Sequence, residues 1–157
     1  MATRGRREAR SLLARAVALL ARREHSRAEL ANKLRRSLTD ADDPAEIDQV
    51  LDALERDKLL SDERYAGALT RTRSARFGDA RVRFDLKSAG VAVATVDRAV
   101  ASLKGTELER ARAVWVRRFG EPPRTPQERG RQARFLQARG FSTETIRKVL
   151  RGLPGDD

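Results

Sequence analysis

The chain has 157 residues, of which 34 are lysine or arginine and 23 are aspartate or glutamate, so its formal net charge is +11. It has no cysteine and a single histidine, His25, which excludes disulfides, thiolate metal sites and cysteine nucleophiles. The longest apolar run, residues 16–21, is shorter than a membrane span of about 20 residues or a signal peptide's apolar region of about 7–15. We therefore expect a cytoplasmic protein without a membrane partner.

Apolar residues recur at spacings of three and four along most of the chain, and no segment shows the alternation of a convincing strand. The first helix is expected over about 10–24, with Leu13, Val17 and Leu20 on its inner face. The pattern predicts an all-α protein from its first element onward.

The second and third helices carry start signals. Ser26 and Glu29 have the spacing of a capping box, so a helix is expected to begin at Ser26. Asp43 is expected to cap the third helix, with Pro44 in its first turn and Glu46 bonding back. The expected inner-face residues are Leu30, Leu34, Ile47, Val50, Leu51 and Leu54.

Three more helices are expected between residues 61 and 105. The first begins after Ser61, the second begins near Gly78 and ends at Gly90, and the third ends at Gly105. Glycine at a helix end is favoured because it adopts the left-handed conformation without strain. The expected inner-face residues are Tyr65, Leu69, Thr72, Val82, Leu86, Ala89, Val96, Val100 and Leu103.

The last three helices again have recognisable start signals. Thr106 and Glu109 form a capping box, Thr125 precedes a proline at the first helical position, and Ser142 begins the final helix. The expected inner-face residues are Leu108, Ala111, Trp115, Phe119, Phe135, Leu136, Ile146, Val149 and Leu150.

The second and third groups of helices align at an offset of 50 residues, which indicates an internal repeat. Leu86 then corresponds to Leu136, and Gly90 to Gly140. We expect three tandem three-helix repeats forming an elongated, curved array, because helices this short bury little surface unless neighbouring units stack. The expected divisions are a mobile basic arm (1–9), three repeats (10–60, 61–105 and 106–152) and a flexible tail (153–157).

Charge is distributed in blocks. The net charge is +8 over residues 1–37, −7 over 38–64, +5 over 65–104 and +5 over 105–157. The acidic block lacks the ligand spacing of a calcium loop, so we expect no metal there. It is interpreted as a solvated loop and helix face, with contact to a basic partner or local repulsion of DNA as the alternative.

The excess of arginine marks the candidate binding residues, because a large basic surplus favours contact with phosphate or carboxylate. Five of the seven aromatic residues (Tyr65, Trp115, Phe119, Phe135 and Phe141) mostly fall on expected core stripes, which favours phosphate contact over base stacking. The candidates are Arg22, Arg23, Arg27, Arg35, Arg36, Arg71, Arg73, Arg76, Arg81, Arg83, Lys87, Arg131, Arg134, Arg139, Arg147 and Lys148.

Four stretches, in this order, resemble the RecX family of bacterial RecA regulators and extend over roughly residues 12–152. They are 20–30 (LARREHSRAEL), 50–66 (VLDALERDKLLSDERYA), 77–86 (FGDARVRFDL) followed by Gly90 and Val91, and 134–142 (RFLQARGFS). The resemblance implies three tandem three-helix units, no catalysis and no cofactor. It also implies a protein that binds RecA nucleoprotein filaments and restrains filament extension, ATP hydrolysis and recombinase activity in DNA repair and the SOS response, with weak phosphate-backbone contact to DNA.

Two other function classes are weighed against this one. The net charge alone is also consistent with direct, sequence-nonspecific binding of DNA or RNA. An enzyme is disfavoured because the sequence has no glycine-rich phosphate loop, metal-ligand spacing or nucleophile motif. His25 is interpreted as a residue that packs on a turn and favours the dipole of the preceding helix, rather than as a general base.

Overall fold

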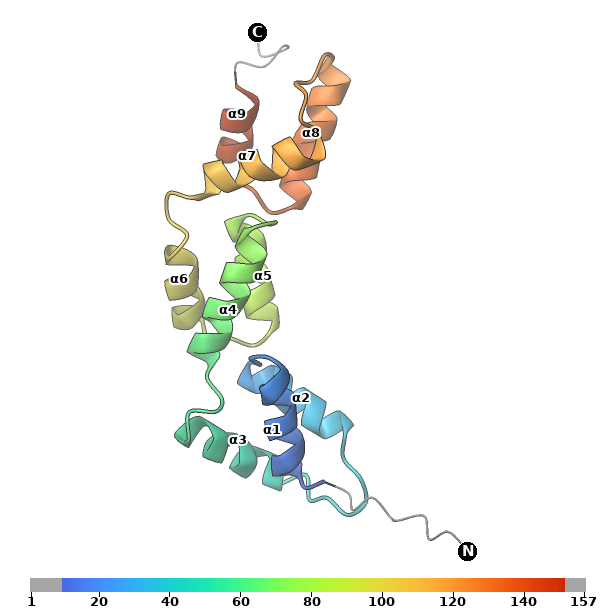
Figure 1. The fold of residues 1–157 in the computed structure, drawn as a ribbon, viewed down its shortest axis with the longest axis vertical. Helices are drawn as coiled ribbons and strands as arrows, with labels where there is room; N and C mark the ends of the chain where they lie inside the picture. Colours follow the sequence, from blue (N-terminus) through green and yellow to red (C-terminus); the bar gives the residue numbers. More distant parts are fainter. Residues whose placement is uncertain (1–9, 152–157) are drawn as a thin grey trace, which may run out of the picture. The chain divides into compact units, whose positions relative to one another are not determined.

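The computed structural model describes residues 10–151, which fold as nine α-helices without a strand (Figure 1). The helices are α1 (Leu12–Arg22), α2 (Arg27–Arg36), α3 (Glu46–Arg56), α4 (Asp62–Ser74), α5 (Asp79–Ser88), α6 (Val93–Ala101), α7 (Glu107–Arg118), α8 (Pro126–Ala138) and α9 (Thr143–Leu150). The all-α prediction is confirmed. None of these helices combines the length and hydropathy that a membrane crossing requires. The expected arm at 1–9 and tail at 153–157 lie outside the described residues.

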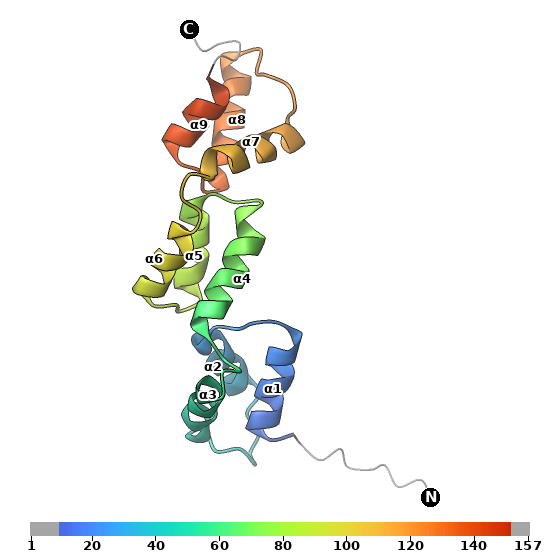
Figure 2. The same ribbon diagram turned by 60° about the vertical axis from the view of Figure 1, so that its left-hand side comes forward.

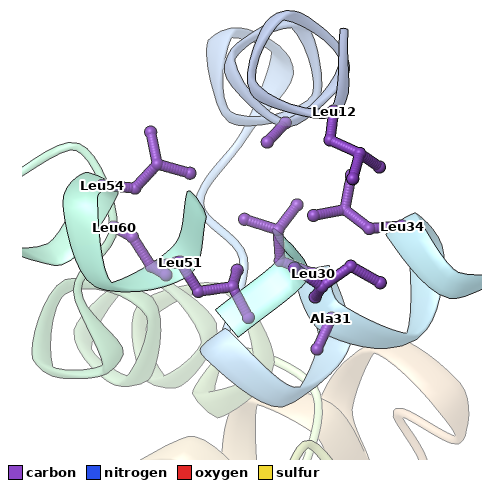
Figure 3. Packing of buried hydrophobic residues seen from close by; sticks show 9 residues of the cluster. Leu12, Leu30, Ala31, Leu34, Leu51, Leu54 and Leu60 are labelled. Atoms are coloured by element: carbon purple, nitrogen blue, oxygen red, sulfur yellow. The ribbon is translucent and has the colours of Figure 1, made fainter. Parts of the chain in front are cut away.

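The chain divides into two compact units between Tyr65 and Ala66, within α4. In the first unit, α1, α2 and α3 enclose a core made mostly of leucine (Figure 3). Its buried members are Leu12, Ala16, Leu30, Ala31, Leu34, Ile47, Leu51, Leu54 and Leu60. The inner faces predicted for the second and third helices are therefore confirmed, except that Val50 is only partly buried.

The inner face predicted for α1 is wrong at Leu13 and Val17, whereas its third member, Leu20, is partly buried and packs against the core. Leu13 and Val17 are 48% and 42% exposed, whereas Leu12 and Ala16 are buried. Both pairs have the same four-residue spacing, and α1 is apolar around most of its circumference. Periodicity therefore could not select the face, and packing against Leu30 and Leu34 of α2 decides it.

Three predicted start signals are confirmed by hydrogen bonds. The Ser26 hydroxyl accepts from the Glu29 backbone N–H at 3.0 Å, and Thr125 and Ser142 accept equivalently at 3.1 Å. Each satisfies a donor that the first turn of a helix leaves without an intrahelical partner.

Two other start signals are wrong. Asp43 accepts from the Ala45 N–H at 2.9 Å and so closes the turn before α3, which has no side-chain cap. The Thr106 hydroxyl donates backward to the Leu103 carbonyl at 2.6 Å and likewise does not cap α7. In both cases the side chain bonds to its own turn, which competes with capping. In α4, Thr72 is exposed, against expectation, and Thr70 is buried instead.

The second unit contains most of α4 and α5–α9, with α7 lying crosswise to α8 and α9 (Figure 2). Val82, Leu86 and Val96 are fully buried in α5 and α6. A second core cluster joins the last three helices, and its buried members are Ala111, Val114, Leu136, Phe141, Ile146, Val149 and Leu150.

Two glycines bring the start of α5 against the end of α8. The Gly78 N–H donates to the Arg139 carbonyl at 2.8 Å. A Cβ atom added to Gly140 would lie 2.5 Å from the Arg81 Cβ, so only glycine fits there without a shift. Gly140 also has φ +85°, a backbone conformation that other residues rarely adopt.

Two charged residues of α7 tie this helix to the start of α5 and to α9. Arg110 donates to the carbonyls of Ser74 (3.0 Å) and Phe77 (2.7 Å) and pairs with Asp79. Glu107 accepts from the Asp79 backbone N–H at 3.1 Å and from the Thr145 hydroxyl at 2.7 Å. The starts of α5, α7 and α9 therefore share one polar network.

Replacing Leu86 with alanine is expected to lower the free energy of unfolding by about 2–5 kcal/mol, because Leu86 is fully buried and its loss leaves a cavity. Lys87→Ala at the exposed neighbouring position should change it by less than about 0.5 kcal/mol. Urea unfolding followed by circular dichroism measures both values. Equal stabilities would contradict the assigned core.

Candidate arginine-rich binding surfaces

In the first unit, three of the predicted binding arginines make internal contacts. Arg23 binds both carboxylate oxygens of Glu29, at 2.5 and 3.2 Å, and this hydrogen bonding raises the pKa of Arg23. Arg27 pairs with Asp52 and Glu55, at 2.8 and 3.1 Å. Arg35 donates to the Asn32 side chain at 2.8 Å, while Arg22 and Arg36 are exposed and pair with no carboxylate of residues 10–151. These last two retain the most freedom to meet a ligand.

The predicted binding residues of α4 and α5 likewise include some that pair with a carboxylate and some that do not. Asp85 lies 3.7 Å from Arg73 and 3.0 Å from Arg81, and Asp97 lies 2.5 Å from Arg83. Arg71, Arg76 and Lys87 are exposed and have no carboxylate partner in the described chain. The basic face expected on α5 is thus partly neutralised by aspartates on α5 and α6.

The candidates of α8 and α9 are mostly exposed. Lys148 pairs with Glu144 at 3.1 Å, whereas Arg131, Arg134 and Arg147 face solvent without such a pair within residues 10–151. Arg139 differs, because it is half-buried against aromatic rings.

Arg139 belongs to a hollow of about 310 Å³ in the second unit, which we call the arginine pocket. It is formed by the ends of α7 and α8 and by the turn after α4. Its lining residues are Arg76, Val114, Arg117, Arg118, Phe135 and Arg139. Two of them, Arg76 and Arg139, are predicted binding residues, and the structure brings these two together.

Aromatic rings position the guanidinium groups in and around the arginine pocket. The Arg139 Cζ atom lies 5.0 Å from the Phe135 ring centroid and 5.2 Å from that of Phe77. The Arg118 Cζ atom lies 5.6 Å from the Phe135 centroid and 5.2 Å from that of Phe119. Contact with a ring face orients a guanidinium while leaving its N–H edge able to donate.

The arginine pocket is suited to an anion. Its lining contains four cations and no carboxylate. Arg117 donates to the Ala75 carbonyl at 2.9 Å, which fixes one donor and leaves the charge uncompensated. Phosphate and carboxylate oxygens are the groups that such planar, preoriented donors bind best.

Sequence reasoning missed Arg117 and Arg118, because they follow the core residue Trp115 and look like the solvated end of a helix. The adjacent Arg-Arg pair next to an aromatic residue, Phe119, is the signal that was available.

The prediction that aromatic residues belong to the core is confirmed for Tyr65 and Phe141, which are buried. It holds only partly for the half-buried Trp115, Phe119 and Phe135. Phe84 was not placed on any stripe, and the structure leaves it 64% exposed on α5. An exposed phenylalanine beside basic residues is an available stacking platform, which weakens the argument against base contact.

His25 is buried, and both of its ring nitrogens have a partner within the protein. It is 1% exposed, with Nδ1 3.0 Å from the Arg23 carbonyl and Nε2 2.8 Å from the Lys33 ammonium. A neutral ring that donates through Nδ1 and accepts through Nε2 satisfies both contacts, and burial lowers the pKa of His25. Packing on the turn is therefore confirmed, but a charge favouring the helix dipole is not part of its role.

Stability is expected to fall as the pH drops below about 6.5, the ordinary pKa of histidine. Above this pH, His25 is neutral in both the folded and the unfolded chain. As the pH falls, the unfolded chain binds a proton at His25 at a higher pH than the folded chain does, which favours unfolding. His25→Gln should flatten the dependence between pH 7.5 and 5.5 in urea unfolding. Identical pH profiles for the two proteins would contradict a buried neutral ring.

The acidic block also makes internal contacts. Asp42 accepts from Arg15 at 2.6 Å and from the Thr39 N–H at 2.8 Å, and the bond from Arg15 lowers the pKa of this carboxyl. Across the part of the chain that the structure describes, no three acidic or histidine side chains gather as a metal site would need.

Comparison with known proteins identifies the relatives of this chain. Models of the second and third three-helix domains of RecX match residues 61–100 and 106–150. A regulatory protein RecX from Leptothrix cholodnii is 50% identical over 141 residues, which are 90% of this chain and 88% of that protein. One from Ralstonia pickettii is 41% identical over 142 residues, 90% of this chain and 87% of that protein.

A crystal structure of RecX from Lactobacillus salivarius superposes with a TM-score of 0.72 at 18% identity, covering 89% of this chain and 92% of that one. It supports the fold, while the sequence relatives establish the family. The chain belongs to the RecX family of regulatory proteins.

Proposed function

We propose that this protein binds RecA nucleoprotein filaments in the cytoplasm and restrains their extension, ATP hydrolysis and recombinase activity during DNA repair and the SOS response. It does so by binding alone, without a cofactor or a catalytic step of its own. Membership of the RecX family is the observation that carries the proposal. The arginine pocket supports it as a contact for phosphate or carboxylate groups, both of which a protein–DNA filament presents.

The repeat organisation fits the same role. The second and third repeats, expected at 61–105 and 106–152, are joined through Gly78, Gly140 and Arg110. We propose that this joint holds the arginine pocket in a fixed geometry for the filament.

DNA-dependent ATP hydrolysis by RecA tests the proposal. Substoichiometric amounts of the protein are expected to lower the rate, because a bound regulator acts on many subunits of one filament. Unchanged hydrolysis together with no co-sedimentation with filaments would refute it.

Direct binding of nucleic acid is the second candidate function. The exposed Phe84 favours it, because base stacking and nearby cations are features of single-strand binding. Such binding would weaken steeply as salt rises. Tight binding to naked DNA at physiological salt, with no preference for RecA-coated DNA, would favour this candidate over the first. Negligible affinity for bare DNA would remove it.

A further inference from the structure

A second hollow lies in the first unit, between α1 and α2, and has a different character from the arginine pocket. Its volume is about 410 Å³. We call it the α1–α2 groove, and its lining residues are Arg10, Arg15, Ala18, Leu19, Arg22, Lys33, Arg36 and Ser37.

The α1–α2 groove is built from one face of each helix. On α1, residues 15, 18, 19 and 22 follow the three- and four-residue spacing of a single helix face. On α2 and its C-cap, residues 33, 36 and 37 do the same. Ala18 and Leu19 supply aliphatic surface, and five basic side chains surround it.

Two of these basic side chains are held in place by the protein. Arg15 donates to the carbonyl of Ser37 at 2.7 Å and to its hydroxyl at 2.9 Å, and it pairs with Asp42. Lys33 contacts His25 Nε2 at 2.8 Å. Both are therefore oriented before any ligand arrives, which reduces the entropy cost of binding.

The other three basic side chains, Arg10, Arg22 and Arg36, are exposed and pair with no carboxylate among residues 10–151. They leave a positive rim around apolar surface. A ligand that complements this groove needs negative charge at its edges and an apolar side chain at its centre.

We propose that the α1–α2 groove binds an acidic amphipathic peptide segment, whose apolar side chain rests on Ala18 and Leu19 while its carboxylates meet the basic rim. The lining contains no aromatic ring on which a nucleobase could stack, and a phosphate backbone has no apolar group to cover Leu19. The arginine pocket is also basic but differs in having an aromatic ring, Phe135, in its lining. The inference does not depend on RecA being the partner.

The test uses the full chain and a fluorescein-labelled synthetic helical peptide of about 15 residues, long enough for helix formation, with leucines on one face and glutamates flanking them. Fluorescence anisotropy is expected to show saturable binding. The double variant Arg22→Glu, Arg36→Glu should weaken it at least tenfold. The matched control Arg35→Glu, Arg56→Glu changes the same net charge at exposed positions outside the groove and should weaken it less than threefold.

Two further measurements separate the alternatives. A peptide with serine in place of leucine should bind at least tenfold more weakly, whereas an oligo(dT) strand should compete poorly. The proposal would be overturned if the peptide showed no saturable binding, or if the control variant lost as much affinity as the groove variant. It would also be overturned if the serine peptide bound as tightly as the leucine peptide, or if oligo(dT) displaced the peptide completely. Unchanged melting temperatures and far-UV circular dichroism confirm that the variants are folded.

Discussion

Replacing Gly140 with alanine is expected to lower the free energy of unfolding of the second unit by about 2–5 kcal/mol. Two effects add. An alanine held in the left-handed backbone conformation costs about 1–2 kcal/mol, and the steric overlap of its methyl group with a packed neighbour costs about 1–3 kcal/mol. The new Cβ would lie 2.5 Å from the Arg81 Cβ and 2.7 Å from the Arg81 nitrogen, so the neighbouring backbone must move.

Gly105 provides a matched control. Its φ of +79° is close to the +85° of Gly140, but a Cβ added there would meet nothing within 4 Å. Gly105→Ala should therefore show only the conformational cost of about 1–2 kcal/mol. Urea unfolding measures both variants, and equal destabilisation would mean that the contact between α5 and α8 is looser than described.

Charge reversal in the arginine pocket is expected to have the largest effect on function. The double variant Arg118→Glu, Arg139→Glu removes two charge-assisted contacts, each worth about 1.5–3 kcal/mol, or roughly a 10- to 100-fold change in affinity. If both arginines contact phosphates, the salt dependence of binding should also become shallower: the magnitude of the slope of log affinity against log salt concentration should decrease by about 1.4–1.8. Filament co-sedimentation across a salt series measures both quantities.

Two exposed basic residues outside the arginine pocket, Lys104 and Arg112, serve as the control pair. Lys104→Glu, Arg112→Glu changes the net charge equally within the same unit. A loss of binding as large as in the pocket variant would mean that total charge, rather than this pocket, drives association.

Local signals were sufficient to predict most of the fold. Ser26, Thr125 and Ser142 cap helices as expected, since capping depends on residues three apart in sequence. The inner face of α1 was not predictable, because Leu12 and Leu13 are equally apolar and only contact with other helices distinguishes them.

The binding surfaces were less predictable for a related reason. Sequence identifies which residues are basic, but not which aspartate lies opposite each one. Asp85 pairs with Arg81 one turn away on α5, and Asp97 of α6 pairs with Arg83. The charges of two candidate binding residues are therefore partly neutralised. Arg118 and Arg139 lie 21 positions apart, and only folding brings both onto Phe135.

Photocrosslinking to RecA filaments tests the central claim most directly. A benzoylphenylalanine in place of Ala75 reports on what approaches the arginine pocket, because Ala75 is exposed, precedes Arg76 and accepts a hydrogen bond from Arg117 through its carbonyl. We expect crosslinks to RecA or to DNA in filaments, at higher yield than from the same group at Lys104. Filaments that bind the protein but give no greater yield at Ala75 would contradict the proposed role of the pocket.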